Sequence, residues 1–321
     1  MRRAPFAAVL ALAGLAVLVG RSTASSAGGP IAVKLPKHVF GHFQQADLRD
    51  VDARWGKSPG QVGLVQAEAG PSGGSSFDVV NGVACVLDQH NGRVDVFDPR
   101  KKPRSIPLKV SGSQGSVFRG VDSSLAVGAD GRIYVAEPTD SAHAKPVLRT
   151  FASSGGAPTS TATTVGTNPI VRATGKKAYI TQLLSGPWKS TTGASTPARP
   201  YADGSRIQVG AGSGRPIAVT LRRSDGTILT WRITSPDHVS VEDAESFGGI
   251  EAVVALTVNA NGKRTEYEVL ILGPHGVLQS FSVPQDQYTS TALFDDFRVE
   301  GSTIYHRGST KKGLYVDEFQ F

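Results

Sequence analysis

The sequence predicts an all-β fold, and three features support this prediction. Short runs of alternating apolar and polar residues recur along most of the chain, and turn dipeptides such as Asn81-Gly82 separate them. Glycine (37) and proline (19) are abundant, whereas methionine occurs once. The marker turns recur every 36 to 51 residues, roughly the length of one blade of a β-propeller. They lie near residues 81, 130, 174, 225, 261 and 301.

The clearest unit is a predicted three-stranded meander near the start of the repeats. Its strands are Ser76–Val80, Val83–Asp88 and Arg93–Asp98, each only about five residues long. Asn81-Gly82 and Asn91-Gly92 supply the turns, because these dipeptides suit tight hairpins. The same pattern returns at 124–151, 170–181, 217–231, 252–272 and 296–319.

Six blades are expected from this spacing, since residues 56–321 hold about six units of roughly 45 residues. A β-sandwich is the second alternative, although two in tandem would be needed to use the chain. The Gly/Ser/Thr/Pro-rich stretch 185–214 is interpreted as a long loop within or between blades. We expect an N-terminal segment, 28–55, to close the ring by pairing a strand around Lys37–Phe43 with the C-terminal strand.

The first unit resembles the repeat of NHL-type six-bladed propellers, which follows a phrase close to F-x-V-x-x-G-x-x-x-V-x-D-x-x-N-x-R-V-x-x-F-D. The match is good over one blade, fair over two or three, and poor over 185–249. Residues 55–64 resemble the lead-ins of uncharacterised secreted bacterial propeller proteins. The resemblance implies an architecture and leaves activity open, because such propellers include binding scaffolds, lyases, lactonases and sensor domains. The matching positions are Phe77, Val79, Gly82, Val86, Asp88, Asn91, Arg93, Val94, Phe97 and Asp98.

An export signal is predicted at residues 1–27. Arg2 and Arg3 precede an apolar stretch from Phe6 to Val19, and small residues follow up to Ala27. Cleavage is favoured over an uncleaved anchor helix, because the apolar stretch is shorter than the roughly 20 residues that span a bilayer. No cysteine lies near the exit, which excludes a lipoprotein anchor. We therefore expect a secreted, periplasmic or cell-envelope protein with no stable membrane span after cleavage.

Cysteine content and charge limit the function classes further. Cys85 is the only cysteine, so no intramolecular disulfide can form, and its alternating apolar neighbours predict a small buried hydrophobe. The net charge of +7 includes three arginines of the leader, so the remainder carries about +4. These charges are scattered and do not favour nucleic-acid binding. A protein or a cell-envelope glycan is the expected partner.

The most suggestive chemical cluster is Asp88, His90, Asn91 and Arg93. A carboxylate, an imidazole and a guanidinium within six residues could supply a base and an anion clamp. The structural interpretation is favoured instead, in which Asn91-Gly92 makes a turn and Arg93 braces neighbouring blades through Asp88.

Acids of separate blades are the candidates for a site at the channel mouth. The resemblance to propeller lactonases implies that acids and asparagines of several blades could hold a divalent cation such as Ca²⁺. Glu137, Asn168 and Asp296 are the candidate ligands, and Asp295 lies beside the last of them. The candidate catalytic residues are Asp88, His90, Glu137 and Asp296. No other cofactor is predicted.

The remaining motifs favour structure over chemistry. His38 and His42 would lie about 13 Å apart on one face of an extended segment, which is too far for one metal ion. The G-x-S-x-G patterns at 56–60 and 70–74 are interpreted as loops, because neither joins a strand to a helix.

Two functions follow as hypotheses. The leading one is a non-enzymatic exported propeller that binds a protein or glycan partner through its loops or top face. The alternative is a lactonase-like hydrolase or lyase with a channel-mouth site that could depend on Ca²⁺. The alternative requires several acids and a histidine to converge at one end of the channel.

Overall fold

The computed structural model describes residues 29–67, 70–109, 123–138, 146–163, 168–210, 216–249, 251–260, 265–289, 292 and 294–321. The regular structure in these ranges is entirely β. No helix among them is long and apolar enough to cross a membrane. The predicted leader, 1–27, lies outside the described residues.

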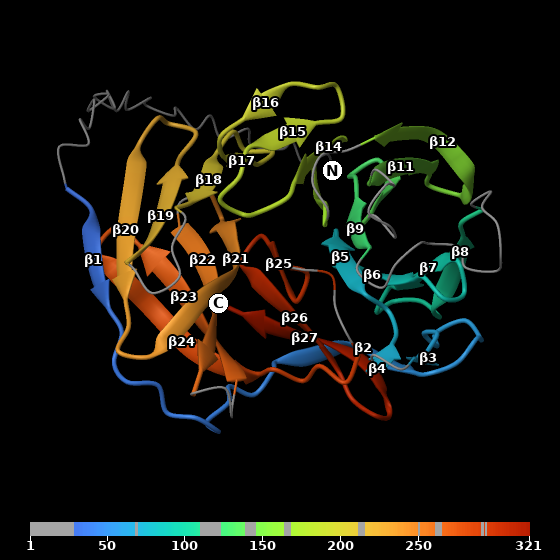
Figure 1. Cartoon of the computed structure of the whole chain (residues 1–321), viewed down its shortest axis with the longest axis horizontal. Helices are drawn as coiled ribbons and strands as arrows, with labels where there is room; N and C mark the ends of the chain where they lie inside the picture. Colours follow the sequence, from blue (N-terminus) through green and yellow to red (C-terminus); the bar gives the residue numbers. More distant parts are fainter. Residues whose placement is uncertain are drawn as a thin grey trace, which may run out of the picture.

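Six sheets surround a central axis as the blades of a β-propeller, which confirms the predicted fold class (Figure 1). Blade one is β5 (Ser76–Val80), β6 (Val83–Asp88), β7 (Arg93–Phe97) and β8 (Arg104–Pro107), and blade two is β9 (Ser124–Val127), β10 (Ile133–Glu137), β11 (Val147–Ala152) and β12 (Gly155–Thr163). Blade three is β13 (Ile170–Thr174), β14 (Lys177–Thr181), β15 (Trp188–Ser190) and β16 (Ser195–Thr196), and blade four is β17 (Arg199–Pro200), β18 (Arg206–Val209), β19 (Ile217–Arg222) and β20 (Ile228–Thr234). Blade five is β21 (His238–Phe247), β22 (Glu251–Asn259), β23 (Thr265–Gly273) and β24 (Gly276–Pro284), and blade six is β25 (Phe297–Glu300), β26 (Thr303–Ser309), β27 (Gly313–Gln320) and β2 (Leu48–Arg54).

The ring is closed by strand pairing between the two ends of the chain, as expected, but through a different strand. β2 pairs antiparallel with β27, and Val51 and Ala53 of β2 are fully buried. The predicted closing segment, Lys37–Phe43, forms no strand. Gly41 adopts φ +86° in a turn there, which interrupts the extended backbone that a strand requires.

The rest of the N-terminal segment packs on the outside of the ring. β1 (Ile31–Lys34) adds a fifth strand to blade four, parallel to β20, with Ile31 opposite Trp231. Residues 35–46 then cross blade five and lead into β2, and β3 (Val65–Ala67) and β4 (Gly70–Ser72) form a small hairpin before blade one. One continuous segment therefore contacts blades four, five and six.

The hydrophobic core lies between neighbouring blades. Phe77 packs between blades six and one, Phe151 between blades one and two, and Trp231 among blades three to five; all three are 0% exposed. Cys85 lies in the cluster between blades one and two, as a small buried hydrophobe. Because both faces of each blade are covered this way, the strands bury apolar side chains on both sides.

Two serines tie the first strands of successive blades together near the axis. The Ser76 hydroxyl of β5 accepts a hydrogen bond of 2.8 Å from the Leu125 amide of β9. The Ser124 hydroxyl of β9 accepts one of 3.2 Å from the Val171 amide of β13. A serine at the equivalent position of β5 and β9 therefore makes the same hydrogen bond to the next blade.

The marker turns do not all occupy the same place in a blade. Those near 81, 130, 174 and 301 join the first and second strands, whereas the turn near 225 joins β19 to β20 and residue 261 lies outside the described residues. In blades four and five the equivalent turns contain Gly204 and Gly249, with φ +88° and +75°. The expected loop at 185–214 is wrong, because it includes β15, β16, β17 and β18.

Candidate functional site

Charged side chains from five blades meet at the axis and form a buried network. We call it the axial network: Asp78, Arg172, Arg199, Asp243, Glu245, Asp295 and Arg298. All of its members except Asp78 are at most 8% exposed. A buried ion pair without further partners is costly, so the contacts of each member decide whether the network is structural or functional.

Three ion pairs of the axial network are close enough for both partners to remain charged. Arg172 Nη1 lies 2.6 Å from Asp295 Oδ1, and Arg298 Nη2 lies 2.9 Å from the same oxygen. Arg199 bonds to Glu245 Oε1. Burial alone would raise the pKa of Asp295, but Arg298 and Arg172 outweigh it and hold that pKa below its usual value.

Asp243 is the least compensated acid of the axial network. Its Oδ2 atom is 3.7 Å from Arg172 Nη2 and has no hydrogen-bond partner among the described residues. Burial and the neighbouring Glu245 raise the pKa of Asp243 to about 7. Burial beside Glu245 therefore favours the neutral form of this carboxyl group.

A cavity of about 450 Å³ opens at the end of the channel where the first two strands of each blade turn. We call it the axial pocket. All six blades contribute to its wall, which shares four residues with the axial network: Asp78, Arg199, Glu245 and Arg298. Tyr201 donates a hydrogen bond of 2.9 Å to Glu245 Oε2, and the Arg199 guanidinium stacks 4.8 Å from the Tyr201 ring. Tyr201 thus contacts both Glu245 and Arg199 and holds this charged part of the wall in place.

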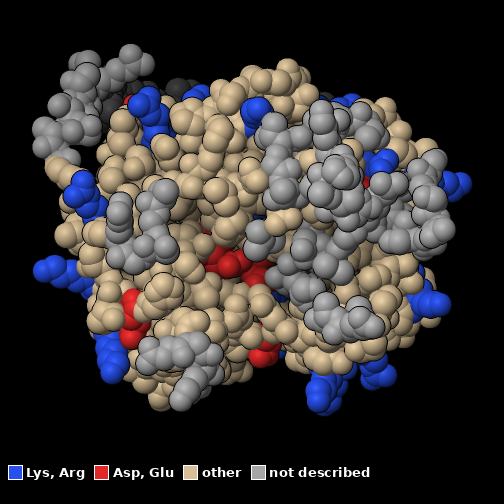
Figure 2. All heavy atoms as spheres, viewed as in Figure 1, with Lys and Arg blue, Asp and Glu red and all other residues tan. Residues whose placement is uncertain are grey.

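A second group of acids lies where the first strands begin. Tyr267 and Gln287 each donate a hydrogen bond of 2.5 Å to Asp296 Oδ2, and Arg307 Nη1 lies 3.6 Å from Asp296 Oδ1. Glu242 occupies the bulge of β21 between Val241 and Asp243. Burial, followed by repulsion from Asp296, raises the pKa of Glu242 well above its usual value. Acids also gather at the centre of the face in Figure 2, with lysines and arginines around its rim.

Asp88 and Arg93, from the cluster predicted around Asp88, bind each other and the segment 57–63. Asp88 is fully buried and accepts hydrogen bonds from Gly63 N (3.0 Å), Asn91 Nδ2 (2.6 Å) and Arg93 Nε (3.1 Å). Arg93 also donates to the carbonyls of Lys57, Ser58 and Gln61. The pair therefore fastens blade one to the loop that follows β2 of blade six.

The other predicted site residues do not form one constellation. His90 lies 3.0 Å from the Ser72 hydroxyl, and burial lowers its pKa. Glu137 bonds to Arg149 within blade two, and Asn168 is half-buried before β13. Asp296 alone among them belongs to the acids at the channel end. Within the described ranges, no group of three or more His, Cys, Asp or Glu residues is arranged to hold a metal ion.

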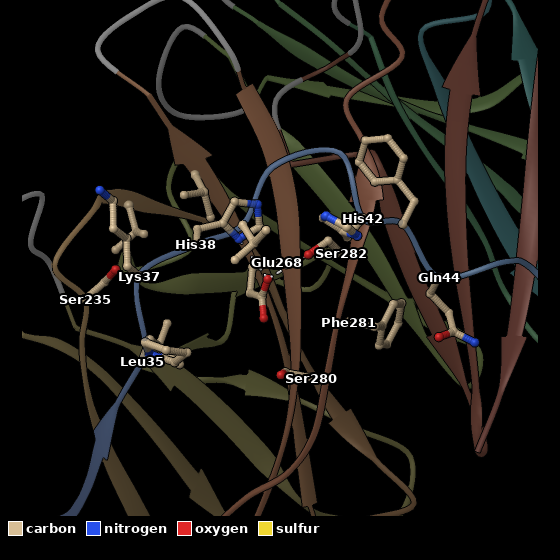
Figure 3. Close-up of a pocket in the computed structure, with 15 residues that line it drawn as sticks. Leu35, Lys37, His38, His42, Gln44, Ser235, Glu268, Ser280, Phe281 and Ser282 are labelled. Carbon is tan, nitrogen blue, oxygen red and sulfur yellow. Dashed lines mark hydrogen bonds and ion pairs between the residues drawn. The ribbon is translucent and has the colours of Figure 1, made fainter.

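The expectation for the two histidines is wrong in its geometry. The turn at Gly41 brings His38 and His42 to the wall of one side cavity of about 440 Å³, between residues 35–44 and blade five (Figure 3). His38 Nε2 lies 3.2 Å from Glu266, and Nδ1 lies 3.1 Å from Glu268. Both ring nitrogens thus hold the crossing segment to β23.

Sequence reasoning missed most of the axial network. Arg172, Arg199 and Glu245 lie in three separate blades, and no spacing relates them. The sequence does contain one indication of this network. Arg172 follows Ile170 and Val171 in a strand whose apolar residues predict burial. A charge within such a strand indicates a buried partner.

The fold and the site define a six-bladed β-propeller with a charged axis. No family model matches the chain, and no curated protein matches it at the significance required. A streptogramin B lyase structure is 9% identical and covers 85% of this chain and 97% of that chain, with a TM-score of 0.38. Virginiamycin B lyase from Staphylococcus aureus with quinupristin is 11% identical (83% and 82% covered, TM-score 0.36). A PL25 ulvan lyase is 10% identical (86% and 84% covered, TM-score 0.39).

Proposed function

We propose that the protein is an exported, NHL-type binding propeller that takes a polar group of a protein or cell-envelope glycan into the axial pocket. The observation that carries the proposal is the construction of the pocket, because all six blades supply residues to one cavity of about 450 Å³. That volume lies within the range of small-molecule sites, roughly 300–1,000 Å³. A chain terminus or a single sugar of a larger partner fits that range.

The polar wall of the pocket supports recognition of a polar group. Arg199 and Arg298 line it, and the Nε atom of each lacks a hydrogen-bond partner among the described residues. An acceptor of the ligand that reaches either guanidinium group forms a charge-assisted hydrogen bond, which is stronger than a bond between neutral groups. Tyr201 and Glu245 hold Arg199 in place, so the wall does not need to reorganise on binding.

Export places this partner outside the cytoplasm. The predicted leader at residues 1–27 supports a secreted or cell-envelope location. Fractionation of the producing cell, with the N-terminus of the recovered protein read by mass spectrometry, tests this part. Recovery of a cytoplasmic protein that retains residues 1–27 would reject it.

A substitution that fills the pocket tests the binding proposal. The protein is screened against envelope glycans and short peptides, and the strongest binder is titrated calorimetrically. Ala202→Trp places an indole at the pocket wall and should weaken binding at least tenfold. Ala32→Trp, on the exposed face of β1, is the control and should leave affinity unchanged. Equal affinities for all three proteins, or no binder in the screen, would reject the proposal.

An acid–base enzyme is the second candidate, because acids and a histidine converge where the first strands begin. His306 lies against Tyr267, with ring centroids 5.7 Å apart, and Tyr267 bonds to Asp296. Asp88 and Glu137, the other residues of the predicted hydrolase or lyase site, have separate partners in blades one and two. A thermal-shift assay with Ca²⁺ and with EDTA tests for a metal-dependent site, since a ligand of the native state raises its stability.

A further inference from the structure

The axial pocket carries more negative than positive charge. The described residues of its wall include four carboxylates, Asp78, Asp203, Glu245 and Glu300, but only two guanidinium groups, those of Arg199 and Arg298. Asp78 and Glu245 are matched by these arginines, because Arg298 Nε lies 3.4 Å from Asp78 Oδ1 and Arg199 bonds to Glu245. Asp203 and Glu300 are therefore the two carboxylates that give the described wall its excess of negative charge.

The two excess carboxylates bind backbone amides and no cation among the described residues. Asp203 Oδ1 accepts a hydrogen bond of 2.9 Å from Ser205 N. Glu300 accepts bonds from Asn81 N (2.6 Å) and Gly82 N (2.7 Å), which join blade six to blade one. Backbone amides orient a carboxylate but leave its formal charge in place. The pocket mouth is therefore anionic.

Gly249 leaves space for the Asp203 carboxylate. A Cβ atom at position 249 would lie 2.2 Å from Asp203 Oδ2, and Gly249 has φ +75°, which disfavours other residues. The positive φ favours glycine at this place in the blade-five turn. Asp203 is exposed and Glu300 is half-buried, so both carboxylates remain accessible from solvent.

We propose that the axial pocket binds a primary ammonium group flanked by hydrogen-bond acceptors, an inference that rests on the proposed binding function. The ammonium would pair with Asp203 or Glu300 at the pocket wall, and an adjacent acceptor would bind the guanidinium group of Arg199 or Arg298, which line the same cavity. A free amino sugar and the N-terminus of a peptide both offer this combination. An anionic glycan would instead meet the excess of carboxylates, and like charges repel.

Paired probes test the inference, because acetylation removes the charge and leaves the rest of each probe intact. One pair is glucosamine and N-acetylglucosamine, and the other is a Gly-Ser-Gly tripeptide and its N-acetyl form. The free amine should bind at least tenfold more tightly than its acetylated partner, and this preference should shrink as salt is added. Preference in the sugar pair alone, or in the peptide pair alone, identifies the source of the ammonium group.

An isosteric pair of variants separates charge from folding. Asp203→Asn keeps the side-chain oxygen that accepts from Ser205 N but removes one negative charge, and it should lower the preference for the free amine about three- to tenfold. Asp225→Asn is the matched control, since Asp225 accepts from Thr227 N at 2.8 Å in another Asp-Gly turn outside the pocket wall. It should leave the preference unchanged. Thermal melts of both variants check folding, and the salt dependence of the unmodified protein needs no variant.

Two other outcomes overturn the inference in different ways. If acetylated and free probes bind equally, and Ala202→Trp weakens both, the pocket binds ligands without ammonium selectivity and only the inference fails. If no probe binds in a way that Ala202→Trp weakens, and the wider screen also finds no binder, the proposed function fails with it.

Discussion

Arg172 and Asp295 form an ion pair across the centre of the ring, with Arg172 Nη1 and Asp295 Oδ1 2.6 Å apart. Arg172 belongs to blade three and Asp295 precedes the first strand of blade six, so the pair joins opposite sides of a ring of six blades. Arg172 also donates to the Phe294 carbonyl. A direct tie of this kind fixes the spacing of the two blades across the axis.

Removing either partner of this pair should destabilise the fold strongly. Arg172→Met leaves the buried Asp295 with Arg298 as its remaining cation, and Asp295→Asn takes the carboxylate from the buried guanidinium groups of Arg172 and Arg298. Each is expected to cost about 3–5 kcal/mol. The double variant should cost less than the sum of the two, by about 0.5–3 kcal/mol. Urea denaturation of the four proteins measures the coupling directly.

An exposed pair on the closing strand provides the control. Arg49 Nε lies 2.7 Å from Asp317, but the Arg49 side chain is 49% exposed, so Arg49→Met should cost no more than about 1 kcal/mol. Additive effects of the two axial substitutions would show that Arg172 and Asp295 do not depend on each other.

The sequence predicted the blades best where turn chemistry and strand length agreed. Asn81-Gly82 was recognisable because both residues adopt positive φ, 54° and 67°, as a tight hairpin turn requires. Blade four has an equivalent Asp203-Gly204 turn, but its neighbouring β17 has two residues and β18 has four. Alternation cannot be recognised over so few residues, so the sequence pattern predicts a loop for this stretch.

The position of the closing strand and most of the site could not be derived from one sequence. Val39 and Phe40 suggested a strand, whereas the observed strand alternates Val51 and Ala53 with charged residues. Arg172 and Asp295 are 123 residues apart, and nothing local relates them. Convergence at the axis depends on the angle between blades, which the pattern of a single blade does not specify.

Arg93 should protect the loop after β2 from proteolysis. Its guanidinium donates to the carbonyls of Lys57, Ser58 and Gln61, so Arg93→Gln should cost about 1.5–3 kcal/mol and accelerate tryptic cleavage after the exposed Lys57. Mass spectrometry of a digestion time course measures this cleavage. Arg100→Gln removes an arginine whose side chain is 71% exposed and should have no such effect. Unchanged cleavage in Arg93→Gln would contradict the bracing role.

His306 should make the fold sensitive to acid. Burial, followed by repulsion from Arg307, lowers the pKa of His306 to about 3. The unfolded chain, with a pKa near 6.5, then binds a proton that the folded chain does not, so stability should be lost as the pH falls from about 6.5 towards 3. Asp243 acts in the opposite direction, because its pKa is raised to about 7 and protonation favours the folded state.

A substitution isolates the contribution of His306 from that of the acids. His306→Phe keeps a ring beside Phe297, where the centroids are 4.9 Å apart, and removes the titrating group. Its melting temperature should fall less than that of the unmodified protein between pH 6.5 and pH 3.5. His275→Phe changes an exposed histidine and should leave the pH profile unchanged. Parallel profiles for His306→Phe and the unmodified protein would show that His306 does not cause the acid sensitivity.

Val51 tests which part of the N-terminal segment closes the ring. It is fully buried in β2, opposite Val316 of β27, so Val51→Asp places an unpaired charge in the core and should cost about 3–5 kcal/mol. Amide exchange of β27 should accelerate at the same time, because that strand loses its outer partner. Val39→Asp makes the same change within 37–43, where Val39 is 63% exposed, and should alter stability by less than about 0.5 kcal/mol. A larger loss from Val39→Asp than from Val51→Asp would contradict closure through β2.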